Sequence, residues 1–133
     1  MGKRQNATIV HITDDPTDGL LVQAVLRKHR NDNVILCDPE KQLASAIIKE
    51  EKPDLILLNS ILLTIDSIQR YHQLKNTLEL KDTPILLWRV AMPKRFTSLA
   101  NDLGIAGFLS IPIEVKTIIE ARDKLLLRAT YYH

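Results

Sequence analysis

The sequence predicts an α/β domain in which a five-stranded parallel sheet is covered by helices on both faces. Short apolar runs rich in Val, Ile and Leu alternate five times with segments whose apolar residues recur at helical spacing. Runs such as 54–58 and 85–88 are apolar at nearly every position, which is typical of central parallel strands. Parallel strands require crossover connections, and the right-handed rule for these makes a three-layer, doubly wound sandwich the expected product.

Each element has its own sequence signal. The expected strands are 7–12, 34–37, 54–58, 85–88 and 107–110. Asp15 and Pro16 supply helix-start chemistry after the first strand, and Gly104 is an expected helix end. The apolar positions expected to line the helices are Leu20, Leu21, Ala24 and Val25 with the stem of Lys28; Leu43, Ala44, Ile47 and Ile48; Ile68, Tyr71, Leu74 and Leu78; Phe96, Leu99, Ala100 and Leu103; and Val115, Ile118, Ile119, Arg122 and Leu126.

Composition narrows the class of protein. The chain has 133 residues, 45% of them hydrophobic and 26% charged, and these fractions are typical of a globular domain. A formal net charge of +2 argues against a nucleic-acid partner, and no apolar run approaches the length of a membrane span. A lone cysteine, Cys37, suits a reducing compartment. We therefore expect one cytoplasmic domain over 1–133, with its core at about 7–128, no effector domain and no membrane partner.

Chemistry in such a sheet is expected where the strands end. Ligands of doubly wound folds bind outside the carboxyl ends of the strands, near the point where the strand order reverses. The residues at those ends are Thr13-Asp14-Asp15, Cys37-Asp38, Asn59-Ser60, Arg89-Val90 and Ser110-Ile111. These positions are the candidates for any binding or catalytic role.

The ordered set of motifs resembles the receiver domain of response regulators, which is CheY-like and has a flavodoxin-like fold. The motifs are Asp14-Asp15-Pro16, Pro53 to Leu58, Thr83-Pro84 before the fourth strand, and Gly104 to Pro112 around the fifth. The resemblance covers about residues 7–128 and implies the strand order 2-1-3-4-5. It also implies a role in two-component signalling, where a receiver accepts a phosphoryl group from a histidine kinase.

The positions that perform this chemistry in the family are replaced here. A receiver needs an aspartate after strand three, acids that hold Mg²⁺ after strand one, a hydroxyl after strand four and a lysine before a proline after strand five. Asn59 stands at the acceptor position and Thr13 at the first acid position. Arg89 replaces the hydroxyl residue and Ile111 the lysine. The resemblance therefore implies a degenerate, atypical receiver that is not an enzyme, uses no cofactor and binds Mg²⁺ weakly or not at all.

The two acids after the first strand, Asp14 and Asp15, belong with Thr13 to the acidic pocket of the receiver pattern, and more than one role is open there. Asp14 is the one matching acid, whereas Asp15, beside Pro16, is equally suited to capping the following helix or to ligation. We hypothesise that Arg89 pairs with Asp14 or Asp15 in place of the metal, the alternative being a solvated side chain. Phe108 occupies the family's switch position, although a plain core aromatic is the simpler interpretation.

The output implied by the resemblance is protein binding. The family's usual contact face corresponds here to Lys94, Arg95, Phe108 and Lys116. The expected partner is a histidine kinase or another regulator, or a second copy of the chain. The alternatives are a conventional phosphorylated regulator and a flavodoxin-like cofactor binder, and the acidic loop after strand one argues against the latter.

Other polar residues have plain explanations. His11 is expected to be a satisfied core or face residue of the first strand, and Cys37 a small core residue. The basic run 27–30 is expected to be the solvated end of the first helix, where cations are favoured.

Overall fold

The fold is described here from a computed structural model, which covers residues 4–38, 44–59, 83–89, 107–110 and 115–131, the backbone alone being described at 87–89, 107–110 and 128–131. The helices predicted around 68–78 and 96–103, with Gly104, lie outside these residues, as does Leu43. No helix of the described residues is both long and apolar enough to cross a membrane.

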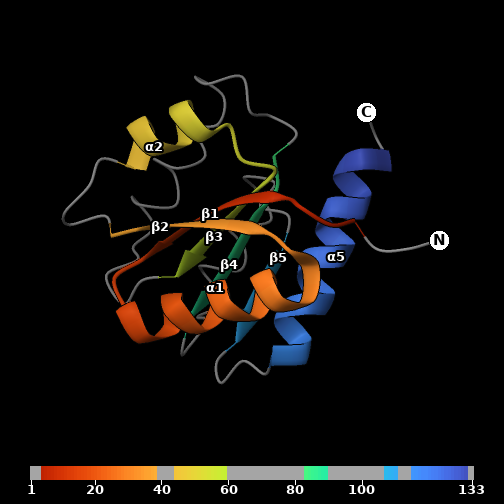
Figure 1. Ribbon diagram of the computed structural model, residues 1–133, viewed down its shortest axis with the longest axis horizontal. Helices are drawn as coiled ribbons and strands as arrows, with labels where there is room; N and C mark the ends of the chain where they lie inside the picture. Colours follow the sequence, from red (N-terminus) through yellow and green to blue (C-terminus); the bar gives the residue numbers. More distant parts are fainter. Residues whose placement is uncertain (1–3, 39–43, 60–82, 90–106, 111–114, 132–133) are drawn as a thin grey trace.

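The predicted parallel sheet is present (Figure 1). Its strands are β1 (Thr8–Thr13), β2 (Asn33–Cys37), β3 (Leu55–Asn59), β4 (Ile85–Arg89) and β5 (Gly107–Ser110). All neighbours pair in parallel, in the order β2-β1-β3-β4-β5, which confirms the predicted topology. The order reverses at β1, because β2 and β3 lie on its two sides, and the carboxyl ends of β1 and β3 therefore flank the expected binding crevice.

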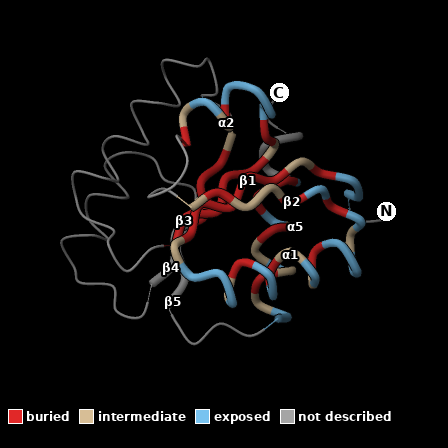
Figure 2. The backbone as a smooth tube through the Cα atoms, turned by 60° about the vertical axis from the view of Figure 1, so that its left-hand side comes forward, coloured by how far each residue is buried: buried red, intermediate tan, exposed pale blue. Residues whose placement is uncertain are grey.

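Helices cover both faces of the sheet. They are α1 (Pro16–Arg30), α2 (Ala44–Glu51) and α5 (Val115–Tyr131). Helices α1 and α5 pack against each other on one face, and α2 lies on the other (Figure 1). The strands between these layers are largely buried (Figure 2).

Alternation along the strands determines which side chains meet α1 and α5. On β1 and β3, Ile9, Leu55 and Leu57 belong to a buried cluster shared with residues of α1 and α5. Successive side chains of a strand point to opposite faces, so His11 and Asn59 lie on the same face as this cluster. The polar residues near the carboxyl edge are thus directed towards α1.

The predicted inward face of α1 is wrong. Gly19, Val22 and Leu26 are buried, whereas the side chains of Leu20 and Leu21 are 59% and 50% exposed. Gly19 explains the difference, because it lets the helix approach β1 closely: a Cβ at Gly19 would lie 3.1 Å from Thr13 Cγ2. On α5, Val115 is likewise 40% exposed rather than part of the inward stripe, while Ile118, Arg122 and Leu126 are buried as predicted.

The ends of α1 are fixed by local side-chain chemistry. Asp15 is the N-cap, and its Oδ1 accepts hydrogen bonds from the backbone N–H groups of Thr17 and Asp18 at 3.0 and 3.2 Å. Asn31 ends the helix in the left-handed conformation at φ 56°, which asparagine tolerates better than most residues. Of the two roles left open for Asp15, the structure therefore supports capping.

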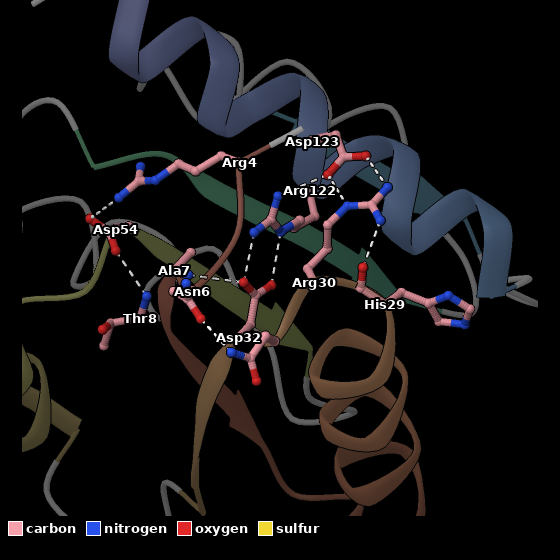
Figure 3. A network of polar contacts seen from close by, with 11 residues as sticks. Arg4, Asn6, Ala7, Thr8, His29, Arg30, Asp32, Asp54, Arg122 and Asp123 are labelled. Atoms are coloured by element: carbon pink, nitrogen blue, oxygen red, sulfur yellow. Dashed lines mark hydrogen bonds and ion pairs between the residues drawn. The ribbon is translucent and has the colours of Figure 1, made fainter. Parts of the chain in front are cut away.

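A buried ion-pair network joins α5 to the amino edge of the sheet (Figure 3). Arg122 Nε donates to Asp32 Oδ2 at 2.8 Å, and its Nη2 donates to Asp32 Oδ1 at 2.6 Å. Both side chains are 0% exposed. The Ala7 backbone N–H also donates to Asp32 Oδ1 at 3.0 Å. Asp32 therefore links the loop after α1, the start of β1 and the middle of α5.

The same network continues to the end of α1. Arg122 Nη1 donates to Asp123 Oδ1 at 2.8 Å, and Arg30 donates from Nε and Nη2 to the two carboxylate oxygens of Asp123 at 2.9 and 2.7 Å. Burial raises the pKa of Asp123, but the hydrogen bonds from Arg30 and Arg122 outweigh it, so the pKa lies below its ordinary value. The hydrogen bond to Asp123 in turn raises the pKa of Arg30. The expectation that 27–30 is a purely solvated cluster is therefore wrong for Arg30.

Candidate functional site

The carboxyl ends of the central strands come together as the sequence predicts. Thr13 and Asn59 are register partners on β1 and β3, and Arg89 and Ser110 are register partners on β4 and β5. The acceptor position and the first acid position of the receiver pattern thus lie side by side at one edge of the sheet.

Three polar side chains form a hydrogen-bonded chain at this edge. Asn59 Nδ2 donates to Asp18 Oδ2 at 2.9 Å, so Asn59 Oδ1 faces the opposite way and lies 2.7 Å from His11 Nε2. Because that amide oxygen can only accept, His11 must carry its proton on Nε2 and donate it. The side chain of Asn59 is thereby held at both ends, between β1 and α1.

Burial favours the neutral form of His11, which lies at the inner end of these hydrogen bonds. His11 is fully buried, and the loss of solvent lowers its pKa, although the hydrogen bond with Asn59 and the nearby Asp18 carboxylate act in the opposite direction. The prediction that His11 is a core residue of the first strand is confirmed. Its contact with the acceptor position was not predicted.

The residues after β1 make contacts of their own. Thr13 is buried, and its Oγ1 accepts a hydrogen bond from the Asp15 backbone N–H at 3.1 Å. Asp15 Oδ1 caps α1, and Asp14 lies partly buried between them. The loop is therefore organised by turn and cap hydrogen bonds.

Two positions at this edge, Thr13 and Asn59, offer neutral oxygen atoms where Mg²⁺ prefers carboxylates. The ion needs several oxygen ligands in octahedral arrangement, with carboxylates to balance its charge. Thr13 Oγ1 and Asp15 Oδ1 accept hydrogen bonds from backbone N–H groups, and Asn59 Oδ1 faces His11 Nε2. Within the described ranges, no three His, Cys, Asp or Glu side chains gather as metal ligands would.

Several predicted site residues are not described at the level of their side chains. The backbones of Arg89 and Phe108 are placed in β4 and β5, but the side-chain hypotheses for both remain untested. Three further predicted site residues lie outside the described part of the chain: Lys94, Arg95 and Ile111. Lys116 is described. Its side chain is 83% exposed on α5, and its Nζ lies 3.8 Å from Glu120 Oε1 in an i,i+4 pair.

Cys37 ends β2 at the same edge but is not poised for chemistry. It is fully buried, and burial raises the pKa of its thiol, with the nearby Asp38 acting in the same direction. A thiol that resists ionisation is a poor nucleophile. The interpretation of Cys37 as a small core residue is confirmed.

Asp18 is the site residue that the sequence analysis missed. It follows the Asp15 cap by three residues, where an acid is expected for its interaction with the helix dipole alone. A signal was nevertheless present: once Gly19 is recognised as the point of closest approach to β1, the preceding residue lies at the border of the buried face and close to the strand ends.

The histidine predicts a measurable pH dependence of stability. The folded-state pKa of His11 lies below the ordinary value of about 6.5, so on acidification the unfolded chain takes up a proton that the folded chain excludes. Stability is therefore full above about pH 6.5 and falls as the pH decreases towards the folded pKa.

We expect His11→Gln, which keeps a donor for Asn59 Oδ1, to flatten this profile. Between pH 7.5 and 5, wild type should lose about 1–2 kcal/mol more unfolding free energy than the variant in urea titrations. Parallel profiles for the two proteins would contradict the assignment of this titration to His11.

Comparison with known proteins places this geometry in context. No family model matches the sequence. Protein PilH of Pseudomonas aeruginosa is 22% identical over 120 residues, covering 90% of this chain and 98% of PilH. Chemotaxis protein CheY4 of Vibrio cholerae has a similar structure, with a TM-score of 0.76 at 18% identity, covering 90% of this chain and 98% of that one. A response regulator from Thermotoga maritima gives a TM-score of 0.77 at 17% identity, covering 92% and 98% of the two chains.

These likenesses agree with the parallel sheet and its strand order. They extend over nearly the whole length of the similar proteins, and the predicted resemblance is confirmed. The chain therefore resembles CheY-like response regulators in sequence and has the fold of their receiver domains.

Proposed function

We propose that this chain is an atypical receiver of two-component signalling that acts by binding a protein partner and does not depend on phosphorylation. The observation that supports the proposal best is the state of Asn59. The residue at the acceptor position is a neutral amide whose oxygen and nitrogen are both engaged, with His11 and Asp18.

The chemistry of phosphoryl transfer explains why this matters. A receiver's acceptor attacks phosphorus with a carboxylate oxygen, while a metal ion and cationic groups neutralise the phosphoryl oxygens. An amide is a much weaker nucleophile, and here its oxygen faces the imidazole. Of the two loop acids, Asp15 caps α1, because its Oδ1 accepts from the backbone N–H groups of Thr17 and Asp18. In this proposal the active and inactive forms differ by partner binding alone.

The partner is a histidine kinase or another regulator, met in the cytoplasm. The contact surface comprises Lys94, Arg95, Phe108 and Lys116, of which Lys116 is described and exposed. A conventional receiver changes this face when the phosphate arrives. Without that event the face stays in one arrangement, which suits a scaffold or a competitor for a partner better than a switch.

The proposal is tested by incubating the purified chain with acetyl phosphate and Mg²⁺ and weighing it by intact-mass spectrometry. We expect no gain of a phosphoryl group, in a reaction where a receiver with an aspartate at this position is labelled. A phosphoryl adduct on the chain would overturn the proposal and favour a conventional phosphorylated regulator.

Partner binding is tested with the same protein, either treated with acetyl phosphate and Mg²⁺ or left untreated. Both samples should retain the same signalling partner in pull-downs from native extract, with Lys116→Glu weakening capture. Lys49→Glu is the matched control, because Lys49 is an exposed lysine on α2, across the sheet. Capture that requires the phosphodonor, or equal loss with both variants, would contradict it.

A further inference from the structure

Residues 4–6, here called the strap, lead into β1 at the amino edge of the sheet (Figure 3). All three are exposed, whereas Ala7, which follows them, is buried. Arg4 Nη2 lies 3.0 Å from Asp54 Oδ1, just before β3, and both side chains are partly exposed. The other oxygen of that carboxylate accepts a hydrogen bond from the Thr8 backbone N–H at 2.8 Å. A partly exposed ion pair thus ties the strap to the start of β3.

Asn6 anchors the strap to the end of α1. Its backbone N–H donates to Arg30 O at 2.9 Å, and its Oδ1 accepts a hydrogen bond from Asn31 Nδ2. Asn6 and Asn31 both have the left-handed conformation, at φ 61° and 56°, which asparagine tolerates better than most residues. The last carbonyl groups of an α-helix have no partner within the helix, so the strap completes the carboxyl end of α1.

Two residues that contact this segment also bind α5. Arg30, whose carbonyl accepts from the strap, donates with its guanidinium to Asp123 at 2.9 and 2.7 Å. Asp32 accepts from the backbone N–H that follows the strap at 3.0 Å, and from the guanidinium of Arg122 at 2.8 and 2.6 Å. The strap and the middle of α5 are therefore held at the same two residues, although they lie far apart in the sequence.

The contacts on the two sides of these residues differ in burial. Arg122 and Asp32 are 0% exposed, and charged hydrogen bonds of this kind are stronger than neutral ones. The strap makes its contacts from exposed residues, and the buried apolar cluster that includes residues of β1, α1 and α5 begins at Ala7. Segments with few buried apolar contacts and exposed backbone hydrogen bonds open locally before the rest of a domain. The strap is therefore expected to open first, which removes one of the groups that hold Arg30.

We propose that the strap and the middle of α5 are energetically coupled through Arg30 and Asp32, so that release of the strap loosens α5. Such coupling is reciprocal, so a change that loosens α5 also loosens the strap. Because the proposed function places a partner on the α5 surface that contains Lys116, the strap is then a regulatory element of that surface, and this consequence rests on the proposed function. The coupling itself is a property of the chain alone.

Hydrogen–deuterium exchange of the full chain, read by mass spectrometry, tests the coupling. The double variant Arg4→Gln/Asn6→Ala removes the ion pair and the side-chain acceptor for Asn31. We expect amides 122–126 of α5 to exchange about threefold faster or more than in wild type. Ile48→Val is the matched control, because it removes a buried methyl group from α2, on the opposite face of the sheet from α5 (Figure 1). At equal loss of unfolding free energy, this control should speed α5 exchange less.

A conservative double variant shows whether the two contacts of the strap are the cause. Arg4→Lys/Asn6→Asp keeps a cation for Asp54 and an acceptor for Asn31 Nδ2. Aspartate also tolerates the left-handed conformation. Exchange in α5 should therefore match that of wild type, and exchange as fast as in Arg4→Gln/Asn6→Ala would contradict the proposal.

The reverse direction is tested with a variant of α5. Asp123→Ala removes the carboxylate that binds the guanidinium of Arg30, and it should speed exchange at the amides of Asn6 and Ala7 by about threefold or more. Strap amides that do not respond to Asp123→Ala, or an α5 that responds no more to strap release than to Ile48→Val, would overturn the proposal. None of these measurements involves phosphate or a partner, so their failure is distinct from a failure of the proposed function.

Discussion

Replacing Asp32 with Ala is expected to lower the unfolding free energy by about 3–5 kcal/mol, a large part of the stability of a domain of this size. The substitution leaves the Arg122 guanidinium, which is 0% exposed, without the carboxylate that accepts two of its hydrogen bonds. It also deprives the Ala7 N–H of its acceptor. A buried charge without its partner costs much more than a surface charge.

Urea unfolding at neutral pH measures this loss. Glu120→Ala is the matched control, because it removes one acid from an exposed i,i+4 pair on the same helix, at 83% and 63% exposure. That change should alter stability by no more than about 0.5 kcal/mol. If Asp32→Ala were as mild as Glu120→Ala, the ion pair would not hold α5 to the amino edge of the sheet.

A double substitution separates the pair's net contribution from the penalty of breaking it. Asp32→Leu with Arg122→Met removes both charges and leaves apolar groups of similar length. Buried ion pairs replaced in this way are often close to neutral, so the double variant should be more stable than either single one. The gain should be incomplete, since Asp123 loses the hydrogen bond that Arg122 Nη1 donates.

The strands were predictable because their signals are local, whereas their order followed from the resemblance to receiver domains. Residues 55–58 are all apolar, and such runs are typical of central strands of a parallel sheet. The inward face of α1 was not predictable from the largest apolar residues. It depends on Gly19, whose missing side chain permits a close approach to Thr13 that a pattern of hydrophobicity does not record.

The site was predicted by position but not by contact. Alignment of strand ends placed Asn59 beside Thr13, and the register confirms it. The partners of Asn59 were missed, because Asp18 lies 41 residues away in sequence and its side-chain direction follows from how α1 sits on the sheet. Contacts between Arg122 and Asp32, separated by 90 residues, carry no local signal either.

Restoring a carboxylate with Asn59→Asp is expected to destabilise the protein by about 2–3 kcal/mol at pH 7. The Asn59 Nδ2 group, which now donates to Asp18 Oδ2 at 2.9 Å, would become an oxygen facing an oxygen. Two carboxylates at that distance cannot both stay ionised without strain, so the pair should take up a proton. The loss should accordingly be smaller at pH 5 than at pH 7.

Urea unfolding in the presence of EDTA, which keeps divalent metal from neutralising the pair, measures this effect. The decisive comparison is the exchanged pair Asn59→Asp/Asp18→Asn, in which an amide on α1 again donates to a carboxylate on β3. It should recover most of the stability lost in Asn59→Asp, while Asp18→Asn alone costs less than about 1 kcal/mol. Were the exchanged pair no more stable than Asn59→Asp, repulsion by Asp18 would not be the reason that an amide suits this position. If the exchanged pair recovers the stability, the two neighbours of Asn59 explain why an amide stands there. His11 and Asp18 fit a neutral side chain that accepts a hydrogen bond on one side and donates one on the other.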